Sequence, residues 1–230
     1  MVFLGDVFSN RELINVQLIS EKFGDETVVV NLESAMSSEE VHEKLGPYLI
    51  AEKDNLLELC GIADIFCLAN NHISDSGVSG LLKTIDILNK KNKKYCGIDK
   101  FEFVDTYEND CKVRIYSITD EFYGNLPLLL GLDSIKRMKP SSDEVDFFVA
   151  NVHMGIEGTE FINQPMMNVT NALVDLGFSC IFFHHAHVPS GYDNIHGTHV
   201  FYGLGNFIFD HGGPSTGLAV KVVFKKENLR

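Results

Sequence analysis

The chain is poor in positive charge. Its 230 residues include 19 Lys and Arg against 32 Asp and Glu, so the formal net charge is −13. Binding to the phosphate backbone of a nucleic acid needs clustered Lys and Arg, so we expect no nucleic-acid partner. The one basic run, residues 90–94, falls where a helix should end, and its charge there complements the helix dipole. An anionic substrate would need another source of attraction, and a metal centre would supply it.

Cysteines and long hydrophobic runs are also scarce. The five cysteines are scattered and show no CxxC spacing, which favours reduced core thiols over a disulfide framework or a zinc ribbon. No apolar run is long enough to cross a bilayer. The first ten residues, MVFLGDVFSN, lack the basic start and the small-residue cleavage site of a signal peptide, and they have the pattern of a first strand. We therefore expect a cytoplasmic protein with no membrane span.

Apolar runs alternate with helically spaced segments along the chain. With 45% hydrophobic residues, the chain can build one sizeable core, so we expect a single domain over residues 1–230. Continuous apolar runs are typical of strands buried on both faces, and their alternation with helices predicts an α/β fold centred on a sheet. The expected strands are 2–7, 27–33, 63–69, 111–118, 145–152, 179–183, 199–205 and 217–224. The expected helices are 51–60, 78–91, 126–138 and 164–176.

Polar residues cluster at the carboxyl ends of the expected strands. In α/β sheets, ligands bind at this edge because several strand-to-helix loops converge there. Five separate segments could therefore bring oxygen and imidazole groups to one place. These residues are Asp6, Glu33, Asn70, Asn71, His72, His153, His184, His185 and His187.

Each segment also has an ordinary explanation. The spacing of His185 and His187 would place both on one side of an extended segment, as two ligands of one centre require, but an isolated HxH is weak evidence. The stretch LANNHISDSG could be a turn with a helix N-cap. A lone histidine or carboxylate at a strand end is usually structural. Taken together, however, these groups are the donors that one or two divalent ions such as Mn, Fe or Zn select.

The same motifs carry a family resemblance. In order, GDV, VVNLES, LANNH, VANVHMGIE, FHHAHVPSGY and YGLGNFIFD resemble those of the CapA, or poly-γ-glutamate capsule synthesis, family, and the agreement extends from residue 5 to about residue 218. That family belongs to the calcineurin-like metallophosphoesterase superfamily. The resemblance implies an α/β sandwich with two β-sheets flanked by helices, and a metal site at the strand ends.

The resemblance also implies roles for individual residues. Asp6 and His187 would bind a first ion, Glu33 would bridge to a second, and the other ligands would complete the second position. The expected metal ligands are Asp6, Glu33, Asn71, His153, His185 and His187.

His72 matches the superfamily histidine beside the metals, a candidate general acid for the leaving group. Four more residues are expected either to contact the substrate or to support the ligands from behind: Asn70, Glu157, His184 and Asn206. For His184 the alternative is the protein surface. For Asn206 it is a role in stabilising a turn.

Two features depart from the pattern. Metallophosphoesterases usually begin with Asp-x-His, whose histidine helps to hold the first metal, but position 8 is Phe8. The first position could then bind weakly, hold a metal through extra waters, or take a ligand from Asn10 or Asn31. Many relatives are longer and resemble exported or membrane-anchored proteins, whereas this chain begins at its first strand. This difference weakens the argument for the role at the capsule surface that the family name suggests.

The leading hypothesis is a metal-dependent hydrolase, a phosphoesterase that uses a metal-activated water on a small anionic or phosphorylated substrate in capsule or polysaccharide biosynthesis. One alternative is a metal-dependent enzyme that acts on an amide bond, by hydrolysis or transfer of a γ-glutamyl amide in polyglutamate metabolism. Another is a non-catalytic capsule-assembly factor, which the missing Asp-x-His histidine would favour.

Overall fold

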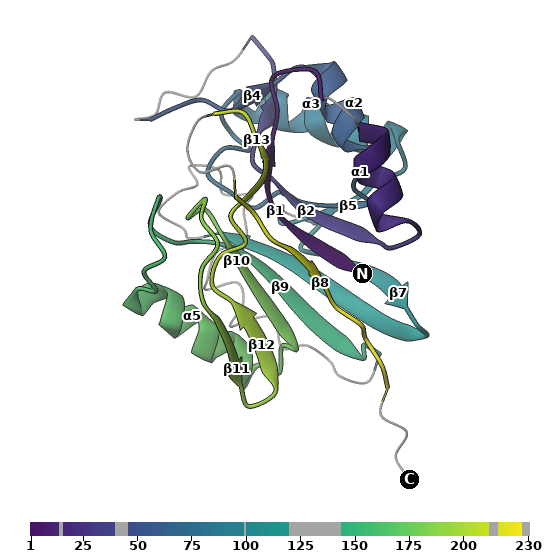
Figure 1. The fold of residues 1–230 in the computed structure, drawn as a ribbon. Coiled ribbons are helices and arrows are strands. Elements are labelled where there is room, and N and C mark those ends of the chain that lie inside the picture. Colours follow the sequence, from purple (N-terminus) through teal and green to yellow (C-terminus); the bar gives the residue numbers. More distant parts are fainter. Residues whose placement is uncertain (14–15, 40–45, 99, 120–143, 212–215, 227–230) are drawn as a thin grey trace.

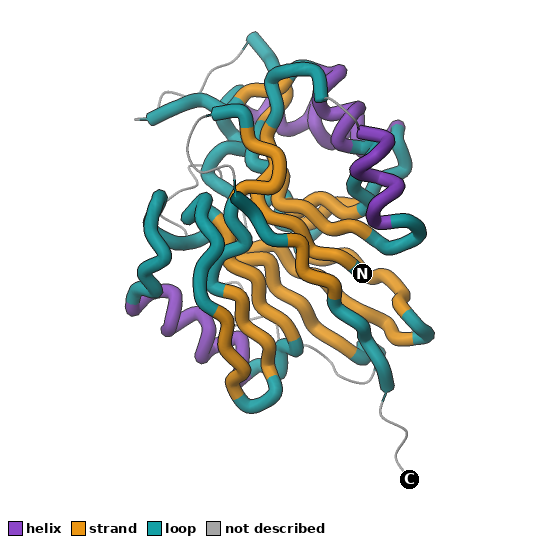
Figure 2. The backbone as a smooth tube through the Cα atoms, in the orientation of Figure 1, coloured by secondary structure: helices purple, strands orange, loops and turns teal. Residues whose placement is uncertain are grey.

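Two six-stranded β-sheets pack face to face at the centre of the molecule (Figure 1). The structure, a computed structural model, describes residues 1–13, 16–39, 46–98, 100–119, 144–211 and 216–226. Helices cover the outer faces of the two sheets, as the ribbon and the tube both show (Figures 1 and 2). This arrangement confirms the expected α/β sandwich.

The first sheet is built around the first strand of the chain. Its order is β13-β1-β2-β5-β6, and β14 pairs with β1 in antiparallel orientation beyond this path. The pairs along the path are parallel, so their carboxyl ends lie at one edge. The strands are β1 (Val2–Phe8), β2 (Val28–Leu32), β5 (Ile65–Cys67), β6 (Lys94–Cys96), β13 (Asn206–Phe209) and β14 (Ala219–Lys221).

The second sheet has the order β11-β12-β10-β9-β8-β7. Its four central strands are parallel, and an antiparallel strand closes each side. A separate two-strand ribbon joins β3 (Ala35–Met36) to β4 (Ile50–Ala51). The strands of the second sheet are β7 (Phe103–Glu108), β8 (Cys111–Thr119), β9 (Phe147–His153), β10 (Cys180–His184), β11 (Tyr192–Ile195) and β12 (Thr198–Phe201).

Three helices, α1 (Val16–Phe23), α2 (Lys53–Leu59) and α3 (Gly77–Lys90), lie over the outer face of the first sheet. The outer face of the second sheet is covered by α5 (Gln164–Asp175). This helix begins where its sequence predicts, because the side chain of Asn163 caps the N–H of Met166 at 2.9 Å and Pro165 follows in the first turn. The helix expected over residues 126–138 lies outside the described residues.

The core has three layers because successive strand residues point to opposite faces of a sheet. On β1, Leu4 faces the helices above, while Phe3 faces the second sheet and stacks on Phe182 of β10 with ring centroids 4.3 Å apart. Phe182 is fully buried and also stacks on Phe201. The aromatic contacts between the sheets therefore fix how the two halves of the molecule face each other.

The chain passes between the sheets where a single strand was expected. The prediction of one strand over 199–205 is wrong, because β12 ends at Phe201 and the chain then crosses to the first sheet, where β13 begins. Gly205 has a φ of 67°, and a Cβ atom on Gly5 would lie only 2.2 Å from its carbonyl oxygen. Two glycines thus allow this backbone to lie against β1, where Asp6 donates its N–H to Gly205 O at 2.8 Å.

The short and partly exposed elements did not appear in the sequence prediction. They include α1, β3, β4, β6, β7, β11 and β13. On β7, exposed and buried residues alternate and Asp105 interrupts the apolar pattern, so the run of six gives a weak signal. No helix in the described parts of the chain is both long and apolar enough to cross a membrane.

Replacement of Phe182 by alanine should lower the free energy of unfolding by about 3–5 kcal/mol, because the change leaves a cavity between two stacked rings. Phe161, whose side chain is 66% exposed, provides the control. Its replacement by alanine should change stability by about 0.5 kcal/mol or less. Urea denaturation of both variants measures the difference, and equal effects would show that the contact between the sheets does not carry this stability.

Candidate metal centre

The expected site residues meet at the edge where strands of both sheets end. Asp6 lies on β1, Glu33 follows β2, and His153 and His184 end β9 and β10. All four side chains are at most 2% exposed. Because the backbone register pairs His184 with His153, adjacent strands of the second sheet present imidazoles at the same level.

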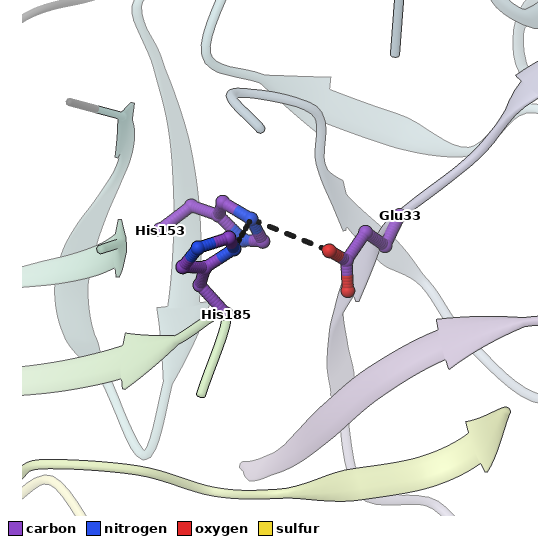
Figure 3. A group of neighbouring side chains, drawn as sticks. All are labelled: Glu33, His153 and His185. Atoms are coloured by element: carbon purple, nitrogen blue, oxygen red, sulfur yellow. Dashed lines mark hydrogen bonds and ion pairs between the residues drawn. The ribbon is translucent and has the colours of Figure 1, made fainter. Parts of the chain in front are cut away.

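One group of donor atoms consists of Glu33, His153 and His185, with all ligand atoms within 4.8 Å of one another. Figure 3 shows the two imidazoles side by side, facing the carboxylate. His153 Nε2 lies 3.4 Å from Glu33 Oε1 and 3.1 Å from His185 Nδ1. The amide oxygen of Asn71 lies 2.7 Å from the same His153 nitrogen. Four of the predicted ligands therefore converge on one point.

The second group consists of Asp6, Glu33 and His187. His187 Nδ1 lies 3.3 Å from Asp6 Oδ2 and 3.8 Å from Glu33 Oε2. Glu33 therefore belongs to both groups and presents a different oxygen to each. This is the arrangement expected of a carboxylate that bridges two ions.

The donor set fits a divalent ion. Ligand atoms around one ion bound at about 2.1 Å lie roughly 3 Å apart, close to the separations in both groups. Carboxylate and amide oxygens with imidazole nitrogens suit Mn, Fe or Zn, and the centre contains no thiolate among the described residues. The residues of either group could therefore hold a metal ion.

Burial and neighbouring groups set the protonation states of the donors, which for His153, His185 and Asp6 are those that metal binding requires. Burial lowers the pKa of His153 well below its usual value and that of His185 to about 4, so both rings are neutral near pH 7. Burial alone would raise the pKa of Asp6, but hydrogen bonds from His184 and His187 outweigh it and hold this pKa well below its usual range. Burial would lower the pKa of His187, but the hydrogen bond to Asp6 raises it.

The segment after β10, which carries His185 and His187, has an unexpected backbone conformation. The prediction that His185 and His187 lie on an extended segment is wrong, because β10 ends at His184 and both residues have positive φ angles, 81° and 59°. Few residues other than glycine adopt this region, and such backbone strain is concentrated at functional sites. As a result, the two rings enter different donor groups.

His72 lies beside the centre, with Nε2 3.9 Å from Glu33 Oε1. Its Nδ1 is 2.8 Å from the carboxylate of Asp75, a buried residue that the sequence analysis did not identify. The same Asp75 oxygen accepts the N–H of Leu49 at 2.7 Å. Asp75 therefore fixes the orientation of the His72 ring and ties it to the segment that leads into β4. The i, i+3 spacing within NNHISD was the only signal for this pair in the sequence.

Of the four residues expected around the ligands, His184 and Asn70 lie behind them. His184 is buried, not at the surface, and its Nδ1 lies 2.8 Å from Asp6 Oδ1. Asn70 is fully buried, accepts the N–H groups of His72 and Ile73, and donates to Leu32 O. It therefore shapes the turn after β5.

Glu157 and Asn206 lie closer to the rings. The side chain of Glu157 is 64% exposed, and its Oε1 is 4.0 Å from His185 Nε2. Asn206 is buried at the start of β13, with its amide oxygen 2.9 Å from His187 Nδ1. Glu157 thus lies at the rim of the centre, whereas Asn206 lies within it.

Asn31 and Asn10 are the two residues considered as replacements for the missing histidine. Asn31 is buried, and its amide nitrogen faces the centre, 2.8 Å from Asp6 Oδ1 and 3.1 Å from His153 Nδ1. Its oxygen accepts a hydrogen bond from Asn70 at 3.3 Å. Asn10 is exposed, and its N–H donates to Asp210. Asn31 therefore links a ligand of each group without being a ligand itself.

The sequence matches a known family over most of its length. The model of the bacterial capsule synthesis protein family, PGA_cap, matches residues 3–123 and 131–211. The chain belongs to this family. It is 32% identical over 170 residues to the capsule biosynthesis protein CapA of Bacillus anthracis, a match over 65% of this chain and 41% of that protein. It is 28% identical over 164 residues to the PGA biosynthesis protein CapA of Bacillus subtilis (strain 168), over 64% and 43% of the two chains.

Solved structures share the fold of this PGA_cap chain at low sequence identity. A hypothetical protein from Thermus thermophilus aligns with a TM-score of 0.59 and 15% identity, over 89% of this chain and 75% of the other. A structure described as a novel phosphatase from Mycoplasma pneumoniae aligns with a TM-score of 0.56 and 16% identity, over 89% and 70%. The expected capsule-family membership is thus confirmed. The chain spans about two fifths of the length of the curated relatives it matches.

In the metal-free protein, the buried histidines should make stability depend on pH. The folded pKa of His185, about 4, lies below the value of about 6.5 for an unfolded histidine. Between these values the unfolded state binds the extra proton, so stability falls as the pH falls. This group should remove about 2 kcal/mol between pH 6.5 and 5.

Urea denaturation after chelation measures this loss. His185→Gln should lose about 2 kcal/mol less than the unchanged protein over the same interval. His199→Gln, at an exposed position, provides the control. The same loss on acidification in the unchanged protein and in His185→Gln would show that His185 takes up its proton equally in the folded and unfolded states.

Proposed function

We propose that this chain is a metal-dependent hydrolase that cleaves a phosphoester in a small anionic or phosphorylated substrate. The observation that carries the proposal is the pair of donor groups that share Glu33, each presenting oxygen and nitrogen atoms at ligand spacing. The phosphatase description of one structural neighbour agrees with it. The family description also supports a role in capsule or polysaccharide biosynthesis.

When divalent ions are bound, they supply positive charge that attracts an anionic substrate and favours ionisation of water near neutral pH. The chain itself holds the donors in place. Asn31 and His184 fix Oδ1 of Asp6, which leaves Oδ2 on the side of His187. In a protein with a formal net charge of −13, the positive charge of bound ions would offset the repulsion of a phosphate.

His72 is proposed to donate the proton that the leaving oxygen takes. Its Nδ1 is held by Asp75, so Nε2 is directed toward Glu33 and the space between the donor groups. A general acid must carry the proton that it gives, so the proposal takes the ring in its protonated form, with Nδ1–H donating to Asp75. Proton donation from Nε2 would neutralise the alkoxide as the bond to phosphorus breaks.

The names of the relatives support a second candidate. One curated relative is a PGA biosynthesis protein, and the same donors would suit attack on the carbonyl of a γ-glutamyl amide. Parallel assays on phosphomonoesters, phosphodiesters and polyglutamate distinguish the two reactions. Metal-loaded protein without activity on any of them would favour the non-catalytic assembly role.

Metal stoichiometry, measured by plasma mass spectrometry on protein without a histidine tag, tests the basis of the proposal. We expect up to two equivalents of Mn, Fe or Zn, and a loss of at least one in His185→Ala because two imidazoles form the Glu33–His153–His185 group. The His199→Ala control should bind as much metal as the unchanged protein. If the protein binds no metal even after reconstitution, the proposal is wrong.

Loss of the His72 imidazole should separate chemistry from metal binding. His72→Ala should lower kcat about 10²- to 10⁴-fold on an alkyl phosphate, with metal content nearly unchanged. The loss should be smaller on p-nitrophenyl phosphate, whose leaving group needs no proton. Asp75→Asn should show the same pattern in weaker form, because it loosens the ring and keeps the imidazole. Equal losses on both substrates, or loss of metal, would give His72 a structural role.

A further inference from the structure

The first metal position, the group of Asp6, Glu33 and His187, has one protein ligand fewer than the second. Phe8 cannot supply the missing donor. Its ring is buried and packs edge-on against Phe209, with centroids 5.7 Å apart. Phe209 in turn lies 4.6 Å from the ring of His187. An aromatic pair therefore fills the space beside this histidine.

Asn206 also contacts the same histidine. Strand β13 runs parallel to β1, and the register pairs Asn206 directly with Asp6. Paired residues of neighbouring strands project from the same face of a sheet, so the amide and the carboxylate extend toward the same space. The amide oxygen lies 2.9 Å from His187 Nδ1, and that nitrogen lies 3.3 Å from Asp6 Oδ2.

The second position shows the same local pattern. There, the amide oxygen of Asn71 lies 2.7 Å from His153 Nε2, which lies 3.4 Å from Glu33 Oε1. In both places an asparagine oxygen, an imidazole nitrogen and a carboxylate oxygen follow one another at ligand spacing. The two asparagines come from different strands of the first sheet, after β5 and at the start of β13, so no local sequence repeat produces the likeness.

We propose that the amide oxygen of Asn206 is the fourth protein ligand of the first position, in the role left open by Phe8. This inference rests on the proposed metal-dependent function. The first position then has three oxygen donors and one nitrogen, and the second has two of each. Oxygen-rich sites favour Mn²⁺, whereas additional imidazole favours Zn²⁺ or Fe, so the two positions should differ in metal preference.

Titration of the chelated protein with Mn²⁺, followed by plasma mass spectrometry after desalting, provides the first test. Asn206→Ala should retain one equivalent under conditions where the unchanged protein retains two. Asn206→Asp should retain two, because a carboxylate oxygen replaces the amide oxygen. Asn55→Ala is the control, since Asn55 is another buried asparagine, on α2, that contacts no donor of the centre among the described residues.

Anomalous diffraction from crystals of the Mn²⁺-loaded protein provides the second test, because it distinguishes a ligand from a hydrogen-bond acceptor for His187. We expect two peaks, one of them in direct contact with Asn206 Oδ1. Two peaks with Asn206 bonded only to His187, or two equivalents retained by Asn206→Ala, would overturn the inference and leave the metal centre intact. A single ion in the unchanged protein, bound at His153 and His185, would overturn it as well. No bound metal would overturn the proposed function itself.

Discussion

The buried carboxylate of Glu33 is the group on which the site depends. It is fully shielded from solvent, and its two oxygens face opposite donor groups, Oε1 toward His153 and Oε2 toward His187. Removing a carboxylate from water is costly unless opposite charge or hydrogen bonds compensate for it. Neutral histidines compensate weakly, and burial keeps the pKa of both His153 and His185 low. Divalent ions held by the two donor groups would balance this charge, which supports the proposed metal centre.

The architecture around Glu33 was largely readable from the sequence. Long strands such as β1 and β9 are buried along almost their whole length and appear as apolar runs, so these strands and their approximate bounds could be predicted. The convergence of their carboxyl ends follows from parallel pairing. The assignment of strands to two sheets did not follow from periodicity, and it came from the family resemblance. Residues 202–205 illustrate the limit, because an apolar stretch that crosses between sheets has the same composition as a strand.

The sequence identified the candidate ligands of the site but not the hydrogen bonds that hold them in place. Carboxylates and imidazoles at strand ends stand out in a sequence, and the structure brings all six expected ligands together. The groups that hold them do not stand out. Asn31 lies within a strand and Asp75 within a turn, and either could have been an ordinary polar residue. Their importance comes from hydrogen bonds to Asp6 and His72. The sequence does not show how these side chains are placed and oriented in space. The left-handed backbone at His185 and His187 was hidden for the same reason.

The position of β1 has a consequence for the order of events during synthesis. This first strand is the neighbour of β13 and β14, the last described strands of the chain, and Asp6 bonds His184 across 178 positions. The centre therefore has an exceptionally non-local set of contacts, and such contacts form late because long loops must close first. A nascent chain would expose this side of β1 until β13 and β14 have been synthesised. An ion held by the complete donor set would then report completion of the whole sandwich.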